Sequence, residues 1–435
     1  MLATSRTIQR TLLAILTVGL ITVCFASGLL AGLAVLAMLA MLSLAVPRLL
    51  HWNTQRIGLQ ALQRKGAEEA GAGLSTELVR QAETIRTACT QCGACAAHCA
   101  FLQEHGLPGV IAGNGLDQPA NQRTAFECSL CELCSAVCPE GLAPADMLLA
   151  LRRQAVTEGS VDLTPFKPLL TYERLGGSKL FAYSDLPRSC RTVFFPGCTL
   201  PGTRPGATWR LFEHLQQGIP NLGIVLDCCS KPSHDLGRQE RFEAAFGRVL
   251  GSLRERGVHR VVTACPNCFR MFKDYGDNLD VAMIYDLVRL PELSGKAEGS
   301  GTAMTVHDPC PLRSERQVQD SVRSILEGLG LSFEEMKHRR RLTVCCGEGG
   351  AAGFVRPEHA RAWSSIRSSE SGGRTVVTYC AGCAAFLGRR LPTLHLIDLL
   401  FDPDRALTGS LQASQGLRTY LNRLRLKRRF KKSLA

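Results

Sequence analysis

The chain has 435 residues, which is enough for two or three domains with separate cores. Its 45% hydrophobic and 20% charged residues are ordinary for a globular protein, but it contains 20 cysteines. A chain of this length is not a small disulfide scaffold, so cysteines grouped as C-x-x-C indicate metal or redox chemistry in a reducing compartment.

The N-terminal residues 11–46 contain no charged residue. A single helix of this length would measure about 54 Å, well beyond a hydrocarbon core of about 30 Å. Because Ser27 and Gly28 offer a turn near the middle, we expect a transmembrane helical hairpin that serves as an anchor over residues 1–52. A cleaved signal peptide is the alternative, but the apolar stretch is too long for one.

Basic residues flank this stretch on both sides, which by the positive-inside rule places both ends in the cytoplasm. We therefore expect a protein of the cytoplasmic membrane whose soluble domains face the cytoplasm. Residues 53–84 are polar and favour a helix, as a connector would.

Two cysteine runs with the spacing C-x2-C-x2-C-x3-C follow, CTQCGACAAHC and CSLCELCSAVC. In two-cluster ferredoxins the fourth cysteine of such a run binds the cluster of the other run. One cubane [4Fe–4S] cluster is therefore assigned to Cys89, Cys92, Cys95 and Cys138. The second cubane is assigned to Cys128, Cys131, Cys134 and Cys99. Zinc is disfavoured, because it takes four tetrahedral ligands and no extra ones. The runs predict an α-helical two-cluster ferredoxin domain over residues 85–150, with a helical insertion between them and a linker at 151–188.

The remaining cysteines, apart from Cys24 and Cys190, form two sets in the order single Cys, Cys-Cys, C-x-x-C. The first set is Cys198, Cys228, Cys229, Cys265 and Cys268. The second set is Cys310, Cys345, Cys346, Cys380 and Cys383. Alone, VVTYCAGC at 376–383 is compatible with zinc or thiol redox chemistry, but VVTACPNC at 261–268 repeats it. Five thiolates are too many for one zinc ion and suit a multi-iron cluster of unusual shape.

Each cysteine group ends a short β-rich run, and helical patterns separate the runs at residues 240–257 and 320–330. The expected strands are 192–195, 223–227, 260–264, 302–306, 341–344 and 375–379. Alternating strands and helices predict a parallel α/β layer, in which groups at the carboxyl ends of strands meet at one crevice.

This pattern resembles the tandem cysteine-rich CCG domains of the heterodisulfide reductase catalytic subunit. It is also similar to the CCG-bearing subunit of anaerobic glycerol-3-phosphate dehydrogenase and to the iron–sulfur subunits of glycolate and lactate oxidation. The resemblance covers about residues 85–402 and places the CCG domains at 189–296 and 302–402. It implies that each five-cysteine set holds a noncubane [4Fe–4S] cluster and that the second set is catalytic. One departure is Ser230, which stands where the family has the glycine of Cys-Cys-Gly.

The resemblance implies a membrane-anchored iron–sulfur oxidoreductase subunit that passes electrons through the ferredoxin clusters to the CCG clusters, which act on a disulfide or other sulfur substrate. The alternative is an electron-transfer subunit between a flavoprotein dehydrogenase and the quinone pool. A structural zinc-binding assembly protein is a third reading. Either redox role requires a partner subunit, namely a cytochrome b, a quinone-reactive protein or a flavoprotein.

Three other residues stand near the second set, namely His307, Asp308 and Glu348. Each could donate a proton when a disulfide is split, or could orient the backbone and the cluster sulfurs. The glycines of CCGEGG at 345–350 are expected to let backbone approach the cluster.

The net charge of +13 is concentrated at the C-terminus and does not indicate nucleic-acid binding. Residues 405–435 contain nine Lys or Arg residues and no acidic residue, and Leu417, Leu421 and Leu424 share one helical face among them. We expect residues 403–435 to form a basic tail, either solvated or attracted to anionic lipid or to an acidic partner subunit.

Overall fold

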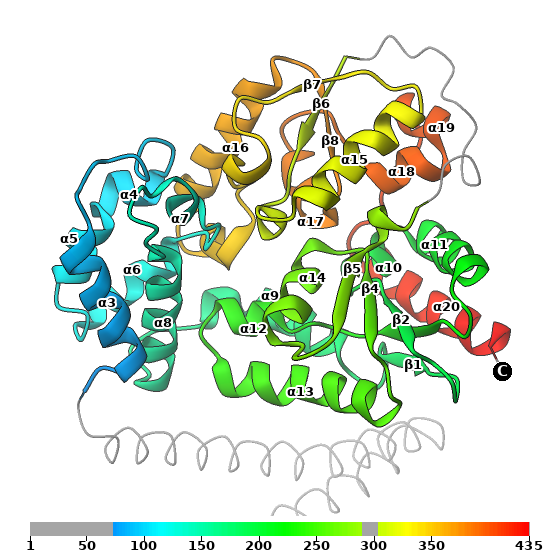
Figure 1. The fold of residues 1–435 in the computed structure, drawn as a ribbon, viewed down its shortest axis with the longest axis horizontal. Coiled ribbons are helices and arrows are strands. Elements are labelled where there is room, and N and C mark those ends of the chain that lie inside the picture. The colour runs from blue at the N-terminus through cyan, green and yellow to red at the C-terminus, as the bar shows by residue number, and fades with distance from the viewer. Residues whose placement is uncertain (1–72, 289–302, 435) are drawn as a thin grey trace, which may run out of the picture. The chain divides into compact units, whose positions relative to one another are not determined.

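In the computed structural model, which describes residues 73–288 and 303–434, the N-terminal part is helical (Figure 1). Short helices precede, separate and follow the two cysteine-bearing loops. The elements are α3 (Thr76–Ala88), α4 (Ala100–His105), α5 (Pro108–Gly113), α6 (Pro119–Thr124), η1 (Ala125–Glu127), α7 (Leu133–Val137) and α8 (Pro144–Thr157). Pro108, Pro119 and Pro144 each begin a helix, where the missing N–H of proline costs nothing. The expected helical insertion between the cysteine runs is thus made of α4, α5 and α6.

A connecting segment leads into the first α/β layer, which has a five-stranded sheet in the order β1-β3-β2-β4-β5. The segment comprises η2 (Thr164–Phe166), α9 (Lys167–Gly176) and β1 (Tyr183–Asp185), and β1 pairs antiparallel to β3. The layer contains β2 (Thr192–Phe195), α10 (Thr199–Thr203), α11 (Pro205–Gly218), β3 (Gly223–Leu226), α12 (Lys231–Asp235), α13 (Gln239–Glu255), β4 (Arg260–Thr263), α14 (Pro266–Tyr275), β5 (Asp280–Met283) and η3 (Ile284–Asp286). Strands β2 to β5 are parallel, with Phe194 opposite Ile224 on one side and Val262 on the other.

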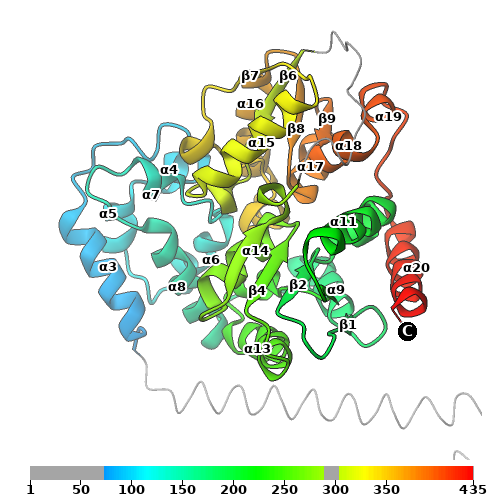
Figure 2. The same cartoon turned by 45° about the vertical axis from the view of Figure 1, so that its right-hand side comes forward.

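The second α/β layer has a four-stranded parallel sheet in the order β7-β6-β8-β9. It contains β6 (Met304–His307), η4 (Cys310–Leu312), α15 (Arg316–Gly328), β7 (Phe333–Glu335), η5 (Arg340–Leu342), η6 (Gly349–Phe354), α16 (Pro357–Ser371), β8 (Thr375–Thr378), α17 (Ala381–Leu387), β9 (Thr393–His395), α18 (Leu396–Phe401) and α19 (Pro403–Leu407). One hydrophobic core runs through both layers, from Phe194 and Val262 in the first to Val306 and Val377 in the second. The ferredoxin-like helices lie on one side of the two layers (Figures 1 and 2).

One expected strand is wrong. The β-rich run at residues 341–344 predicts a strand before Cys345, but Arg340–Leu342 is a 3-10 turn and the strand of this unit is β7. The backbone here bonds to side chains, since Arg313 donates to the carbonyls of Arg341 and Thr343. Carbonyls that are occupied in this way do not need a neighbouring strand.

The basic C-terminal segment is a helix, α20 (Leu417–Ser433), packed on the first α/β layer. Its buried residues Asn422, Arg423, Leu426 and Phe430 form the inner face, and Phe430 lies 4.8 Å from Trp209 and 5.0 Å from Phe212, measured between ring centroids. Leu417 and Leu421, which were expected to share an apolar face, are exposed and do not belong to the packed face. The segment is therefore built into the domain on one side and solvated on the other.

The predicted fold class needs a correction. It included an N-terminal transmembrane hairpin over residues 1–52, and these residues lie outside the described part of the chain. Within residues 73–288 and 303–434, no helix is both long and apolar enough to cross a membrane. The longest helices there, α13 and α20, have 17 residues each and carry charges along their length. The described structure supports the ferredoxin and CCG parts of the prediction and does not support the hairpin.

Candidate functional site

The two ferredoxin-like cysteine loops share one backbone conformation. In the first loop Gln91 and Gly93, which flank Cys92, have φ of 55° and 79°. In the second loop Leu130 and Glu132, which flank Cys131, have φ of 50° and 61°. Left-handed residues on either side of the middle cysteine turn the chain so that three cysteines face a common centre. Three of these four residues are not glycine, so residue type did not indicate this conformation.

Each loop receives its fourth cysteine from the other run. Cys138 lies close enough to Cys95 for its charge to act on that thiol, and the two line one cavity with Cys89 and Cys92. A second cavity gathers the complementary group, Cys99, Cys128, Cys131 and Cys134. The structure thus brings together the two sets that the spacing predicts. Cys345, which belongs to the second α/β layer, also lines the second cavity. This cavity therefore adjoins the second layer.

In the first α/β layer, all five cysteines of the first set follow the carboxyl ends of adjacent strands. Cys198 follows β2, Cys228 and Cys229 follow β3, and Cys265 and Cys268 follow β4. The thiols form a chain of contacts, in which Cys198 meets Cys228, and Cys268 meets both Cys229 and Cys265. Because β2 lies between β3 and β4 in the sheet, parallel pairing delivers the three groups to one edge.

The second layer repeats this arrangement with β6, β7 and β8. Cys310 follows β6 and Cys380 caps α17 directly after β8, while Cys345 and Cys346 follow the turn η5. Sulfur contacts run from Cys310 to Cys345, from Cys346 to Cys345 and Cys383, and from Cys383 to Cys380. The second predicted set is therefore gathered as well.

The environment of both sets favours one thiolate within a pair of sulfurs. A hydrogen bond from Cys228 lowers the pKa of Cys198 to about 6 against the opposing effect of burial, and Arg423 adds to the lowering. The thiols of Cys310 and Cys346 hold the pKa of Cys345 well below its usual range, with further help from the N–H groups of Gly347 and Gly349. Thiolate character is what a metal or an electrophilic sulfur requires of cysteine.

Asp308 is a positioning residue in this structure. Its fully buried carboxylate accepts two hydrogen bonds from Arg323, at 2.6 and 2.9 Å, and one from the hydroxyl of Tyr379 at 2.8 Å. The backbone N–H of Arg340 donates a fourth. Burial opposes ionisation, but Arg323 and the other donors outweigh it and keep the pKa of Asp308 below its usual value. With its acceptors filled, Asp308 ties β6 to α15 and to the turn before Cys345.

His307 differs from Asp308, because neither ring nitrogen has a hydrogen-bond partner within the described residues. The imidazole is fully buried, and one ring nitrogen lies within 4.8 Å of the sulfurs of Cys346 and Cys383. Burial lowers its pKa to about 3, with Arg367 adding to the effect, so the ring is neutral at pH 7. An unpaired N–H aimed at thiols is costly unless a further acceptor is present. The equivalent residue of the first set is Phe195.

Glu348 and Lys231 lie between the two cysteine sets. The carboxylate of Glu348 stands over the C-x-x-C turn, where it would collide with a Cβ at Gly382, and it feels the charges of Cys345, Cys198 and Lys231. The residue is exposed, but the groups packed around the carboxylate displace part of its water. This desolvation, together with the charge of Cys345, raises the pKa of Glu348 to about 7. Lys231 bonds to Asp235 at 2.6 Å and lies near both Cys229 and Cys310.

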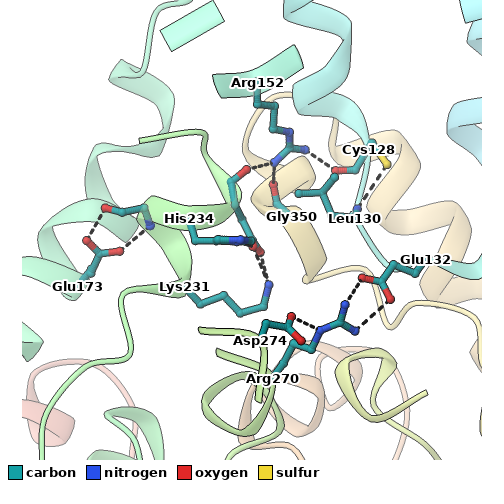
Figure 3. A network of polar contacts seen from close by, with 12 residues as sticks. Cys128, Leu130, Glu132, Arg152, Glu173, Lys231, His234, Arg270, Asp274 and Gly350 are labelled. Atoms are coloured by element: carbon teal, nitrogen blue, oxygen red, sulfur yellow. Dashed lines mark hydrogen bonds and ion pairs between the residues drawn. The ribbon is translucent and has the colours of Figure 1, made fainter. Parts of the chain in front are cut away.

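Sequence reasoning missed Lys231 and the buried arginines of this region. Arg152 on α8 is completely buried and donates to the carbonyls of Cys128, Asp235 and Gly350, which belong to three parts of the chain (Figure 3). Figure 3 also shows Arg270 of α14 bound to Glu132 in the second ferredoxin-like loop. In the sequence, Lys231 is marked as a site residue by its place directly after Cys-Cys-Ser. An arginine within a helix carries no comparable sequence signal. Cys190, which lies outside the two cysteine sets, is buried with its sulfur 3.2 Å from the carbonyl oxygen of Thr192.

The donors present fit iron–sulfur clusters. Each of two cavities is lined by the four cysteines of one predicted set, with Cys134 also at the first cavity and Cys345 also at the second. Two further groups of five thiols converge at strand ends. The unpaired nitrogens of His307 beside Cys346 and Cys383 fit an additional acceptor such as a cluster sulfide.

Two family models match the chain. The model of the 4Fe–4S dicluster domain matches residues 86–142, and that of the cysteine-rich CCG domain matches residues 192–273 and 304–388. A fumarate reductase (CoM/CoB) subunit of Methanothermobacter marburgensis is 27% identical over 59% of this chain and 55% of its own. The chain thus spans about half the length of that relative.

Other relatives match over most of their length. A subunit of dihydromethanophenazine:CoB–CoM heterodisulfide reductase from Methanosarcina mazei is 23% identical over 70% of this chain and 87% of its own. The glycolate oxidase iron–sulfur subunit of Escherichia coli is 22% identical over 74% of this chain and 94% of its own. A probable membrane-anchored ferredoxin of Chromohalobacter salexigens is 24% identical over 62% of this chain and 45% of its own.

Proposed function

Because the chain belongs to the CCG-domain iron–sulfur oxidoreductase family, we propose that it is a heterodisulfide-reductase-like subunit that acts on a disulfide or another sulfur compound at its CCG sites. The observation that carries this proposal is the completeness of both five-cysteine sets together with their contact to a two-site ferredoxin part. Cys131 of the second ferredoxin-like loop and Cys345 of the second CCG set are near enough to act on each other's charge.

The cysteines would hold four clusters. Two cubane [4Fe–4S] clusters would be held by the two ferredoxin-like sets, Cys89, Cys92, Cys95 and Cys138, and Cys128, Cys131, Cys134 and Cys99. Two noncubane clusters would be held by the two CCG sets, with the one on Cys310, Cys345, Cys346, Cys380 and Cys383 catalytic. When bound, these groups supply one-electron transfer between the ferredoxin part and the CCG sites.

The residues between the CCG sites fit the proton and charge requirements of a disulfide reaction. Breaking one S–S bond takes two electrons, drawn from a reduced partner subunit, and two protons, and it releases two thiols. Glu348 is placed to hand a proton to a leaving thiolate, because its carboxylate stands beside the Cys380–Cys383 turn and reaches solvent. Lys231 supplies a positive charge between the sites, which favours thiolate as it forms.

The alternative function is that of an electron-transfer subunit between a flavoprotein dehydrogenase and the quinone pool. The relative named a glycolate oxidase iron–sulfur subunit, which matches over 94% of its own length, favours it. In that case the partner would be a dehydrogenase and the CCG sites would bind no disulfide.

We further propose that the subunit works at the cytoplasmic membrane with a redox partner, either a cytochrome b, another quinone-reactive protein or a flavoprotein. The relative named a membrane-anchored ferredoxin and the exposed basic face of α20 support this placement. Positive charges on an exposed helix are attracted to anionic lipid surfaces.

Electron paramagnetic resonance during turnover separates the two functions. Anaerobically purified protein is reduced, mixed with a heterodisulfide or a small organic disulfide, and frozen at several times. A new paramagnetic species that is lost in Cys346→Ser, while the ferredoxin signals persist, supports action on a disulfide. No new species with any disulfide, together with rapid oxidation by a quinone analogue through a partner, supports the electron-transfer function.

A further inference from the structure

Two buried arginines hold the second ferredoxin-like loop. Arg152, which has no solvent exposure, donates from Nη2 to the carbonyl oxygen of Cys128 at 2.5 Å (Figure 3). Arg313, which is 4% exposed, donates from Nε and Nη2 to the carbonyl oxygen of Cys131 at 3.1 and 2.8 Å. One guanidinium comes from the ferredoxin part and the other from the second CCG domain, so both sides contribute a cation to the same loop.

Neither of these cations is paired directly with a carboxylate. Their other acceptors are also backbone carbonyls, those of Ala125, Asp235 and Gly350 for Arg152 and those of Arg341 and Thr343 for Arg313. Within residues 73–288 and 303–434 neither guanidinium forms an ion pair with Asp or Glu. The carboxylate of Asp235 acts on Arg152 at longer range, but it is paired with Lys231. A buried cation without a direct partner is costly, and Arg152 has no solvent exposure. Such a cation is stabilised by a nearby negative group.

Within residues 73–288 and 303–434, no Arg or Lys side chain donates a hydrogen bond to the first ferredoxin-like loop, residues 89–99. The side chain that bonds to the carbonyls of this loop, those of Ala96 and Ala97, is the neutral amide of Gln103. Cys92 is exposed, so water can stabilise charge at this site. At the second site Cys128 is buried, and the guanidinium groups of Arg152 and Arg313 contact the carbonyls of Cys128 and Cys131.

The difference matters because reduction adds one negative charge to a cluster. A cluster ligated by four thiolates is already anionic, so burial disfavours its reduced state and lowers its potential, whereas a nearby cation favours that state. At the second site the greater burial lowers the reduction potential, whereas the two fixed cations raise it. Solvent at the first site provides the stabilisation that the arginines provide at the second.

We propose that Arg152 and Arg313 raise the reduction potential of the cluster held by Cys99, Cys128, Cys131 and Cys134, so that this buried site can accept electrons from the first ferredoxin site and stands ready to reduce the adjoining second CCG site. The inference rests on the cluster assignment of the proposed function. Arg152 and Arg313 are positioning residues, since they contact the carbonyls of ligating residues and no reacting atom.

A redox titration followed by electron paramagnetic resonance tests the charge effect directly. We expect Arg313→Gln to shift the electron distribution between the two ferredoxin clusters at least tenfold toward the first cluster. For a one-electron couple this corresponds to a fall of about 59 mV in the reduction potential of the second cluster. Arg313→Lys keeps the charge and should retain most of the potential. Arg361→Gln, which removes an exposed arginine paired with Glu358, is the matched control and should leave both potentials unchanged.

Two further measurements keep this test separate from the proposed function. The signal lost in Cys131→Ser identifies the second cluster, and iron analysis shows whether the variants retain their clusters. An unchanged potential of that signal in Arg313→Gln with full iron content overturns the inference while leaving the proposed function intact. Equal falls in Arg313→Gln and Arg313→Lys would also overturn it, because they would mean that hydrogen-bond geometry and not charge sets the potential. Arg152→Gln, if it retains its clusters, should lower the same potential.

Discussion

The carbonyl oxygen of Cys128 lies 2.6 Å from the position that a Cβ would take at Gly350. Gly349 has the same relationship with the carbonyl oxygen of Ser129, also at 2.6 Å. The CCGEGG loop of the second CCG domain and the second ferredoxin-like loop are thus in backbone contact, which only residues without a Cβ permit. These glycines were expected to let backbone approach a cluster, and the structure shows the two cysteine loops approaching each other.

Replacing Gly350 by alanine should therefore separate the two loops. Its φ of 58° adds strain for any residue with a Cβ, so we expect a loss of about 1–3 kcal/mol in unfolding free energy. Electron transfer from the ferredoxin clusters to the CCG site should slow as well, which stopped-flow reduction can measure. The matched control is Gly247→Ala in α13, where a Cβ meets nothing within 4 Å and stability should rise by about 0.5–1 kcal/mol. Equal behaviour of the two variants would contradict the contact.

Glu348→Gln should reduce the turnover of a disulfide substrate by about 10²–10⁴-fold, the usual contribution of a general acid, without changing iron content. The amide keeps the size of the side chain but cannot deliver a proton at the Cys380–Cys383 turn. Steady-state assays with a reduced dye and a disulfide measure the effect. Glu358→Gln on the exposed start of α16 serves as the control. A wild-type rate in Glu348→Gln would remove this residue from the chemistry.

Asp308→Asn should destabilise the second CCG domain by about 1–3 kcal/mol, because Arg323 loses one of its two carboxylate partners and an amide cannot accept all four of the hydrogen bonds that Asp308 receives. Since folding lowers the pKa of Asp308, its contribution is complete above the unfolded value of about 3.9 and is lost as pH falls through the lower folded value. Urea unfolding at pH 7 provides the measurement. The exposed pair of Glu358 and Arg361 is the comparison, and Glu358→Gln should change the free energy of unfolding little.

Phe430→Ala should detach the C-terminal helix from the first CCG domain. The ring is fully buried against Trp209 and Phe212, so its removal should cost about 3–5 kcal/mol. Thermal unfolding, together with limited proteolysis of α20, would measure the loss. Leu421→Ala on the 52% exposed face should change stability little. If Phe430→Ala were as mild as Leu421→Ala, residues 417–433 would be a loosely attached tail.

The spacing of residues along the sequence predicted the features that cluster ligation and strand formation impose on neighbouring residues. The spacing of the two cysteine runs predicted that Cys138 lies with the first three cysteines of the first run, and that Cys99 lies with those of the second run. The β-rich runs predicted that Cys198 and Cys310 follow parallel strands. These inferences succeeded because ligand spacing and strand periodicity are local properties of the chain. The strand at 341–344 failed because a distant side chain, that of Arg313, takes the backbone carbonyls that a neighbouring strand would have bonded.

Other features depend on contacts between distant segments and leave no local pattern. Arg152 looks like any helix residue until folding brings the carbonyls of Asp235 and Gly350 to it. Leu417 and Leu421 looked like an apolar face, but Leu426 and Phe430 form the packed one, since the position of the partner surface decides which face is buried. The separate roles of Asp308 and Glu348 likewise depend on which groups from other elements occupy their oxygens.

The central claim is that the ferredoxin-like and CCG cysteine sets all hold clusters, and iron and acid-labile sulfide analysis of anaerobically purified protein tests it most directly. Four [4Fe–4S] clusters require about sixteen irons per chain. Cys346→Ser should lower this number while the two ferredoxin signals remain. A value near eight in the wild-type protein would contradict the account, because it would mean that the ten thiols gathered by the CCG domains hold no cluster.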